Sequence, residues 1–253
     1  MREHPPQEFA YLRSKLGIMD THLHHEHKEE HLKSSAMLTD VVIGMSDGLT
    51  VPFALAAGLS GAVDSTNIIM IAGIAEVAAG SIAMGLGGYL SGKTEQDHYQ
   101  HELKREYDEV ERVPEREKEE VREFFENIGF SKEMQTMAVE EIAKDKDKWV
   151  EFMMQYELGL DKPDPKRATK SALNIGLSYV VGGLVPLSPY FFFNTPTEAL
   201  KWSVVVTLIC LFIFGYFKSK ITGVTPLWGA LRTMLIGAAA AGAAFGIAKL
   251  FEG

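Results

Sequence analysis

Five long stretches of the chain are almost free of charge, and they alternate with segments that carry many charged residues. The hydrocarbon core of a bilayer, about 30 Å thick, needs about 20 mostly apolar helical residues to cross it. A soluble domain of 253 residues would mix the two kinds of residue more evenly. The stretches are residues 37–60, 67–91, 171–191, 199–217 and 227–250. The sequence therefore predicts an all-α membrane protein with five transmembrane helices.

Composition excludes several classes of function. The formal net charge of −9 argues against a nucleic-acid partner, because a phosphate-binding surface needs a cationic excess. The single cysteine, Cys210, excludes a disulfide framework and a cysteine-rich metal site. The polar first 36 residues contain no apolar segment typical of a cleavable signal peptide. No HExxH motif, phosphate-binding glycine loop or Ser/His/Asp order is present, so we do not expect an enzyme.

Four regions follow from these patterns. Residues 1–36 form a histidine-rich tail, and residues 37–92 hold the first two membrane helices. Residues 93–170 form an insert with 22 Asp or Glu and 15 Lys or Arg, too long and too rich in helix-forming residues to be a simple loop. Residues 171–253 hold the last three membrane helices. We expect the insert to be a helical domain.

Local signals indicate helix boundaries in the insert. No helix breaker lies between Gly92 and Val113, so we expect the second membrane helix to continue into the insert. Pro114 suits the first turn of a new helix. Gly129 is expected to end that helix, and Ser131 to cap the next one.

The distribution of lysine and arginine predicts the topology. The tail and the insert are rich in both, whereas the connections at residues 61–66 and 188–198 contain neither. Five crossings place all the rich segments on one side of the membrane. By the positive-inside rule that side is cytoplasmic, so the N-terminus and the insert are predicted to be cytoplasmic and the C-terminus lumenal.

Small residues and a proline shape the expected membrane bundle. Glycine is frequent in the second and fifth windows, which favours close approach of the helices and a compact bundle. Pro52 lies inside the first window and removes a backbone hydrogen bond, so we expect a kink or a broken helix there.

Three acidic residues and a methionine lie in the first two windows. Asp40 and Asp47 are two helical turns apart on one face, and Glu76 shares roughly one face with Met84. Carboxylate and thioether groups are ligands for divalent metals, and no Lys or Arg lies mid-membrane to neutralise the carboxylates. The alternatives are that Asp40 meets water at the interface, that Asp47 and Glu76 make structural hydrogen bonds, and that Met84 only packs.

Eight side chains on three helices of the insert are candidate metal ligands. Glutamates recur at three- and four-residue spacing, which places them on one face of each helix. The set comprises Glu102, Glu106, Glu109, Glu117, Glu120, Met153, Met154 and Glu157. Carboxylate-rich sites in helical bundles bind iron, manganese and zinc in this way. The alternative is a solvated face whose charges pair with Lys104, Arg105 and Arg116.

The tail contains a histidine tract. Its members are His22, His24, His25, His27 and His31, interspersed with glutamates. Such tracts bind borderline metals readily, but a disordered or helical tail with incidental metal affinity explains the pattern equally well.

The segment from Asp40 to Thr50, with the sequence DVVIGMSDGLT, resembles the first-helix signature of the vacuolar iron transporter family. The resemblance covers residue 37 to the end and includes the glutamate-rich insert and the Met-Met-x-x-Glu run at 153–157. It implies a homodimer in the vacuolar membrane that exchanges iron(II), and often manganese, for protons as an antiporter. It also implies metal sites at the insert's glutamates and methionines, and a path lined by Asp47 and Met84 with Glu76 nearby.

Two other functions remain open at this stage. The chain could be a membrane-anchored metal buffer or sensor, which would need the ligands of the insert but not Asp47. It could also be a structural scaffold whose acidic helices bind proteins. The ligand types do not rank iron(II) against manganese, zinc or cobalt, because carboxylate and thioether ligands suit all four.

Overall fold

The computed structural model describes the backbone of residues 21–251 and the side chains of residues 36–250. This described part is helical and contains no β-strand. The α-helices are α2 (Thr21–Ala62), α3 (Thr66–Arg112), α4 (Pro114–Asn127), α5 (Lys132–Ile142), α6 (Lys146–Phe152), α7 (Arg167–Leu187), α8 (Pro196–Ile221) and α9 (Pro226–Phe251). A π-helix, η1 (Met153–Glu157), follows α6, and a 3-10 helix, η2 (Ser188–Phe191), follows α7.

Within the described residues, five helical segments are long and apolar enough to cross a membrane. They are Ala36–Ala62, Thr66–Arg112, Arg167–Phe191, Pro196–Ile221 and Pro226–Leu250. Each contains one of the five windows expected from the sequence, so the predicted all-α membrane protein with five transmembrane helices is confirmed. Helix α2 begins at Thr21, inside the predicted tail. The histidine tract therefore lies in a helix, but its side chains fall outside those that the structure describes.

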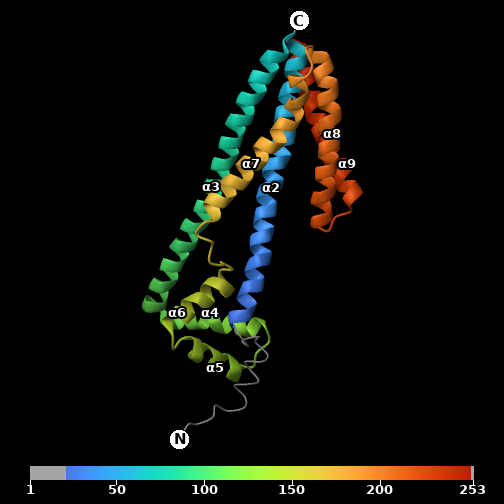
Figure 1. The fold of residues 1–253 in the computed structure, drawn as a ribbon. Helices are drawn as coiled ribbons and strands as arrows, with labels where there is room; N and C mark the ends of the chain where they lie inside the picture. Colours follow the sequence, from blue (N-terminus) through green and yellow to red (C-terminus); the bar gives the residue numbers. More distant parts are fainter. Residues whose placement is uncertain (1–20, 252–253) are drawn as a thin grey trace. The chain divides into compact units, whose positions relative to one another are not determined.

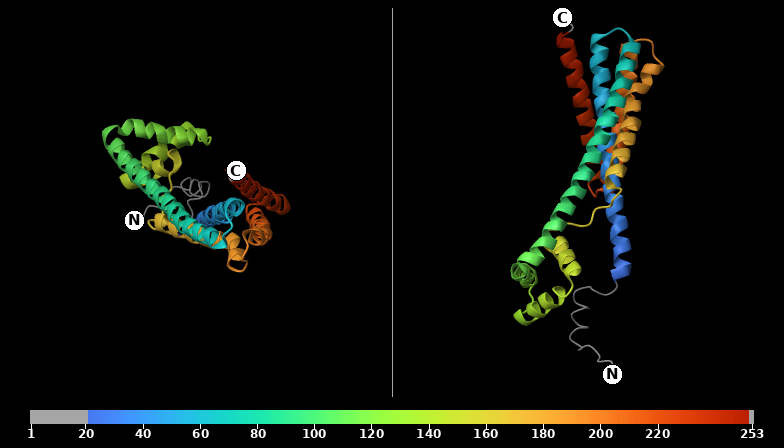
Figure 2. Two further views of the ribbon diagram at one scale, coloured as in Figure 1. Left: turned by 90° about the horizontal axis from the view of Figure 1, so that it is seen from above. Right: turned by 90° about the vertical axis from the view of Figure 1, so that its left-hand side faces the viewer.

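The helices form two compact units, the first comprising residues up to Ile82 and from Asn174 onward. In this unit α2 packs against α8 and α9, and these three helices lie side by side (Figures 1 and 2). Phe53 and Ala57 of α2 are buried together with Ala241 of α9. Inside a bilayer, close van der Waals packing of such side chains holds the helices together, because lipid tails are as apolar as the side chains themselves.

Glycines allow α7 to lie directly against α2 and α3 in the first unit. A Cβ atom on Gly48 would come within 2.3 Å of the carbonyl oxygen of Tyr179. A Cβ atom on Gly80 would come within 2.4 Å of the Tyr179 hydroxyl. The expected close packing through small residues is therefore present. Helix α2 continues through Pro52, so the alternative of a broken helix at this proline is wrong.

The second unit comprises Ala83–Leu173 and contains the end of α3, the helices α4 to α6 and η1. Helix α3 is unbroken to Arg112, as expected, and α4 begins at Pro114. Gly129 follows α4 with a φ of 88°, a conformation that glycine adopts at no steric cost. Ser131 caps α5 by accepting a hydrogen bond from the Met134 amide. The predicted boundaries are confirmed at these positions.

The core of the second unit is apolar and aromatic. Its buried members are Val110, Val121, Phe125, Val139, Trp149, Val150, Met153 and Met154. Phe125 stacks on Phe152 with ring centroids 5.6 Å apart. Asp145 caps α6 through the amides of Asp147 and Lys148. This core fixes the end of α3 and the start of α4 relative to each other.

Candidate metal site and membrane carboxylates

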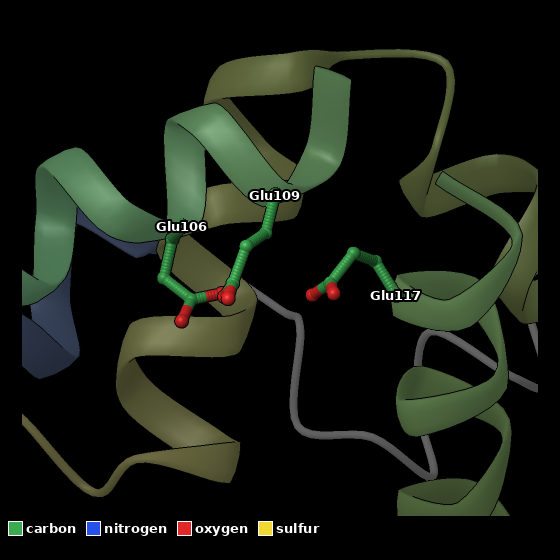
Figure 3. A group of neighbouring side chains, drawn as sticks. All are labelled: Glu106, Glu109 and Glu117. Atoms are coloured by element: carbon green, nitrogen blue, oxygen red, sulfur yellow. The ribbon is translucent and has the colours of Figure 1, made fainter. Parts of the chain in front are cut away.

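Three carboxylates converge where α3 ends and α4 begins. Glu106 and Glu109 lie on the last turns of α3, and Glu117 lies on the first turn of α4 (Figure 3). One carboxylate oxygen from each residue lies within 4.8 Å of those of the other two. Only Val113 separates the two helices, so the chain turns sharply and brings Glu117 to face the α3 pair. Three oxygen ligands at this separation can share one divalent cation.

Burial distinguishes two of these glutamates from ordinary surface acids. Glu106 is 1% exposed and Glu117 is 2% exposed. The Oε2 atom of each is buried and has no hydrogen-bond partner among the described residues. An ionised carboxylate without a partner is costly in such a place, so it favours a proton or a metal ion. For these two residues a solvated face is excluded.

The acidic neighbours change the protonation of the site. Burial, followed by the charges of Glu120 and Glu106, raises the pKa of Glu117 to about 7. The same causes, in the same order, raise the pKa of Glu157 to about 7, although its side chain is exposed at the surface. Carboxyl groups with such pKa values exchange protons near neutral pH. Metal binding at this site would therefore compete with protons.

The remaining candidates of the insert have different surroundings. Glu102 pairs with Arg105 at 2.6 Å, and Glu120 pairs with Arg116 at 3.2 Å. Arg105 and Arg116 therefore form ion pairs of the kind that the alternative interpretation expects, but Glu106 and Glu117 are buried rather than solvated. Met153 and Met154 are buried in the core of the same unit. Both belong to η1, a π-helix that was not predicted from the sequence.

The first unit holds three of the four path candidates, and two of them contact neutral donors. Asp40 is 2% exposed, and the Asn174 side-chain amide donates to it at 3.4 Å. This burial does not favour the alternative that Asp40 simply meets water. The Tyr179 hydroxyl donates to Oε1 of Glu76 at 2.5 Å, while Oε2 of Glu76 is buried with no hydrogen-bond partner in the described part of the chain.

The other two path candidates belong to different units. Asp47 is partly buried on α2, next to Gly48, which touches the backbone of Tyr179. Met84 is partly buried on α3 and belongs to the second unit. A path that joins Asp47 to Met84 remains a prediction.

The sequence interpretation missed Tyr179 and Asn174. Each joins its carboxylate across more than 100 positions of the chain. Helical spacing relates residues within one helix and cannot show such pairs. The available signal was that both are polar residues in the third apolar window, where polar side chains face protein rather than lipid.

Comparison with known proteins settles the family. The model of the VIT family matches residues 38–249, which is most of the chain. The chain belongs to the VIT family. It is 52% identical over 232 residues to vacuolar iron transporter 1 of Oryza sativa subsp. japonica, with 92% of each chain covered.

More VIT family relatives agree with this assignment. Vacuolar iron transporter 1 of Arabidopsis thaliana is 51% identical over 226 residues, covering 89% of this chain and 90% of the relative. Protein CCC1 of Saccharomyces cerevisiae is 38% identical over 224 residues, covering 85% of this chain and 69% of the relative. The resemblance that the sequence predicted is confirmed.

Proposed function

We propose that this protein is a proton-coupled transporter that moves iron(II) from the cytosol into the vacuole. The observation that carries the proposal is the convergence of Glu106, Glu109 and Glu117, with two buried oxygens that lack partners. Such a site fits a cation, and the VIT family relatives bear the name vacuolar iron transporter. The five helices that are long enough to cross a membrane could carry an ion through the barrier that the bilayer presents.

The second unit captures the metal in this proposal. Glu106, Glu109 and Glu117 provide the first oxygen ligands. Glu120 and Glu157 add negative charge nearby, because both contribute to the raised pKa of Glu117. Glu102, Met153 and Met154 complete the candidate set, and the thioethers suit borderline metals such as iron(II). Manganese, zinc and cobalt are further substrates that the same ligand types can accept.

The membrane helices provide the path. The first two apolar windows contain no Lys or Arg, and both Asp47 and Glu76 lie inside these windows, with Asp40 at the start of the first one. A carboxylate in such a place must carry a proton or a metal ion to avoid a large desolvation cost. Exchange of one for the other is the simplest physical basis for antiport. Met84 would offer a thioether on the same route.

The proposal includes a topology, which the charge distribution supports, and a dimeric assembly. The rule that lysine and arginine mark the cytoplasmic side places the N-terminus and residues 93–170 in the cytosol and the C-terminus in the lumen. We expect a homodimer in the vacuolar membrane, with lipid around the apolar outer faces of the helices.

Flux through a sealed membrane tests the proposal. Purified protein in liposomes with an acidic interior should take up iron(II), and the interior should lose protons as it does so. Collapse of the pH gradient with a protonophore should stop accumulation. Metal binding to the liposomes without uptake would overturn the proposal and establish the alternative, a membrane-anchored metal buffer or sensor.

A further inference from the structure

Arg105 contacts three carboxylates at once. Its guanidinium nitrogens lie 2.6 Å from Glu102, 3.3 Å from Glu106 and 3.4 Å from Glu109. All four residues lie on α3, where Glu102 and Glu109 are three and four residues from Arg105 and so lie beside it on the helix surface. Glu106 is the next residue in the chain. Two of the three carboxylates belong to the group that could hold a metal ion. A protein cation therefore already stands beside the candidate site.

The two carboxylate oxygens of Glu106 have different surroundings. Oε1 accepts from Arg105, and Oε2 is buried without a hydrogen-bond partner among the described residues. Oε2 of Glu117 is also buried and without a hydrogen-bond partner in that part of the chain. One side of the site is thus neutralised by Arg105, while the other side presents two oxygens that an entering cation could use.

Arg112, on the same helix, provides a contrast. It pairs with Asp108 at 2.9 Å, and both side chains are more than half exposed. Neither residue belongs to the candidate ligand set. An exposed ion pair of this kind contributes little and is screened by salt. Arg105 differs because Glu106, one of its partners, is buried.

We propose that Arg105 is the internal counter-ion of the metal site, and that a divalent metal competes with its guanidinium for Glu106 and Glu109 when it binds. The proposal rests on the proposed function of the cluster as a metal site. Arginine carries a fixed positive charge, so it opposes every cation that enters. A monovalent ion gains too little to displace a guanidinium held by three carboxylates, whereas a divalent metal gains more from each carboxylate. Arg105 thereby lowers the affinity, favours divalent ions and eases release.

Substitution of Arg105 by glutamine tests this role in the full-length protein. Manganese(II), which resists oxidation, would be titrated calorimetrically into detergent-purified wild type, Arg105→Gln and Arg112→Gln. The last variant removes the same charge from the same helix away from the candidate ligands. We expect Arg105→Gln to bind manganese(II) at least about tenfold more tightly, equivalent to about 1.4 kcal/mol. Arg112→Gln should change the affinity less than about threefold, as expected for an exposed pair.

Thermal unfolding gives a second readout. Without metal, Arg105→Gln leaves the acidic group without its counter-ion, so its unfolding midpoint should fall below that of wild type. Saturating manganese(II) should raise the midpoint by more in this variant than in wild type. Arg105→Lys keeps the charge, but one ammonium group cannot span three carboxylates as a guanidinium does, so its affinity should lie between the two.

The outcomes separate this inference from the proposed site. The double variant Glu106→Gln with Glu117→Gln removes the charge of two clustered carboxylates. Any manganese(II) binding that it retains measures binding elsewhere in the chain, including the histidine tract. Suppose that the double variant lacks the manganese(II) binding seen in wild type, but that Arg105→Gln binds manganese(II) no more tightly than Arg112→Gln. Arg105 is then only structural, and the inference fails. If the double variant binds as wild type does, the cluster is not the metal site and both proposals fail.

Discussion

In the second unit carboxylates gather around Arg105, whereas in the first unit Asp40 and Glu76 each contact a neutral donor, Asn174 or Tyr179. The two arrangements suit different surroundings. Beside water, a full positive charge can hold several acids together at a modest desolvation cost. Within an apolar bundle a permanent cation is expensive, whereas a neutral hydroxyl such as that of Tyr179 can hold a single carboxylate at a lower cost. The cluster of carboxylates in the second unit suits accumulation of metal, and the single carboxylates in the first unit suit passage of one ion at a time.

The largest expected effect concerns the membrane side of this comparison. Asp47→Asn keeps the shape of the side chain and removes its charge, so the protein should fold while iron(II) flux into liposomes falls to background. Manganese(II) binding at the second unit should be unchanged. Asp64→Asn is a matched control, because Asp64 is exposed between α2 and α3. Normal flux through a folded Asp47→Asn variant would show that Asp47 is structural.

A smaller effect is expected from pH at the second unit. Glu117 and Glu157 have pKa values of about 7, above the ordinary 4.5, so protons compete with metal below neutral pH. Manganese(II) affinity should fall at least about tenfold from about pH 7.5 to about pH 6, measured by calorimetric titration. Glu117→Gln should flatten this dependence. An affinity that is constant over this range would place the metal elsewhere.

The same pKa values predict the opposite trend for metal-free protein. A carboxyl group whose pKa is higher in the folded state favours folding below its unfolded value of 4.5, and this contribution is lost as the pH rises through about 7. The unfolding midpoint without metal should therefore decrease over this range, measured by thermal melting. Saturating metal should remove the decrease, because the bound ion replaces the lost protons.

The smallest effect is expected at the neutral donor of Glu76. Tyr179→Phe removes the hydroxyl that holds Oε1 but keeps the ring that packs against Gly80. Iron(II) flux should fall about threefold to tenfold, as expected for loss of one hydrogen bond to a carboxylate. Tyr190→Phe is the control, since the Tyr190 hydroxyl contacts Ser60 instead. Equal effects of the two substitutions would show that Tyr179 has no special role at Glu76.

Sequence periodicity predicted the elements that local chemistry determines. The apolar windows, the long α3, the start at Pro114 and the cap at Ser131 all depend on residues close together in the chain. Glu106 and Glu117 were also both among the predicted metal ligands, because their spacing places them on the acidic faces of their helices. The spacing left a solvated face open for both residues, and only their burial excluded it.

The missed features depend on tertiary packing. The sequence suggested Arg105 as an ordinary partner of the acidic stripe, and only the structure shows its contacts with three carboxylates. The pairing of Tyr179 with Glu76 requires α7 to lie against α3, which glycine allows but no local signal specifies. The π-helix at Met153–Glu157 likewise has no clear local cause in the sequence.

The single residue between α3 and α4 has a consequence for biosynthesis. Glu106 and Glu117 are 11 positions apart and are joined through one turn at Val113. Closing so short a loop costs little chain entropy, and contacts between near neighbours in sequence form early in folding. None of the three clustered carboxylates, Glu106, Glu109 and Glu117, comes from α7, α8 or α9, which are translated later. A growing chain can therefore bring these three carboxylates together before the last three membrane helices have left the ribosome.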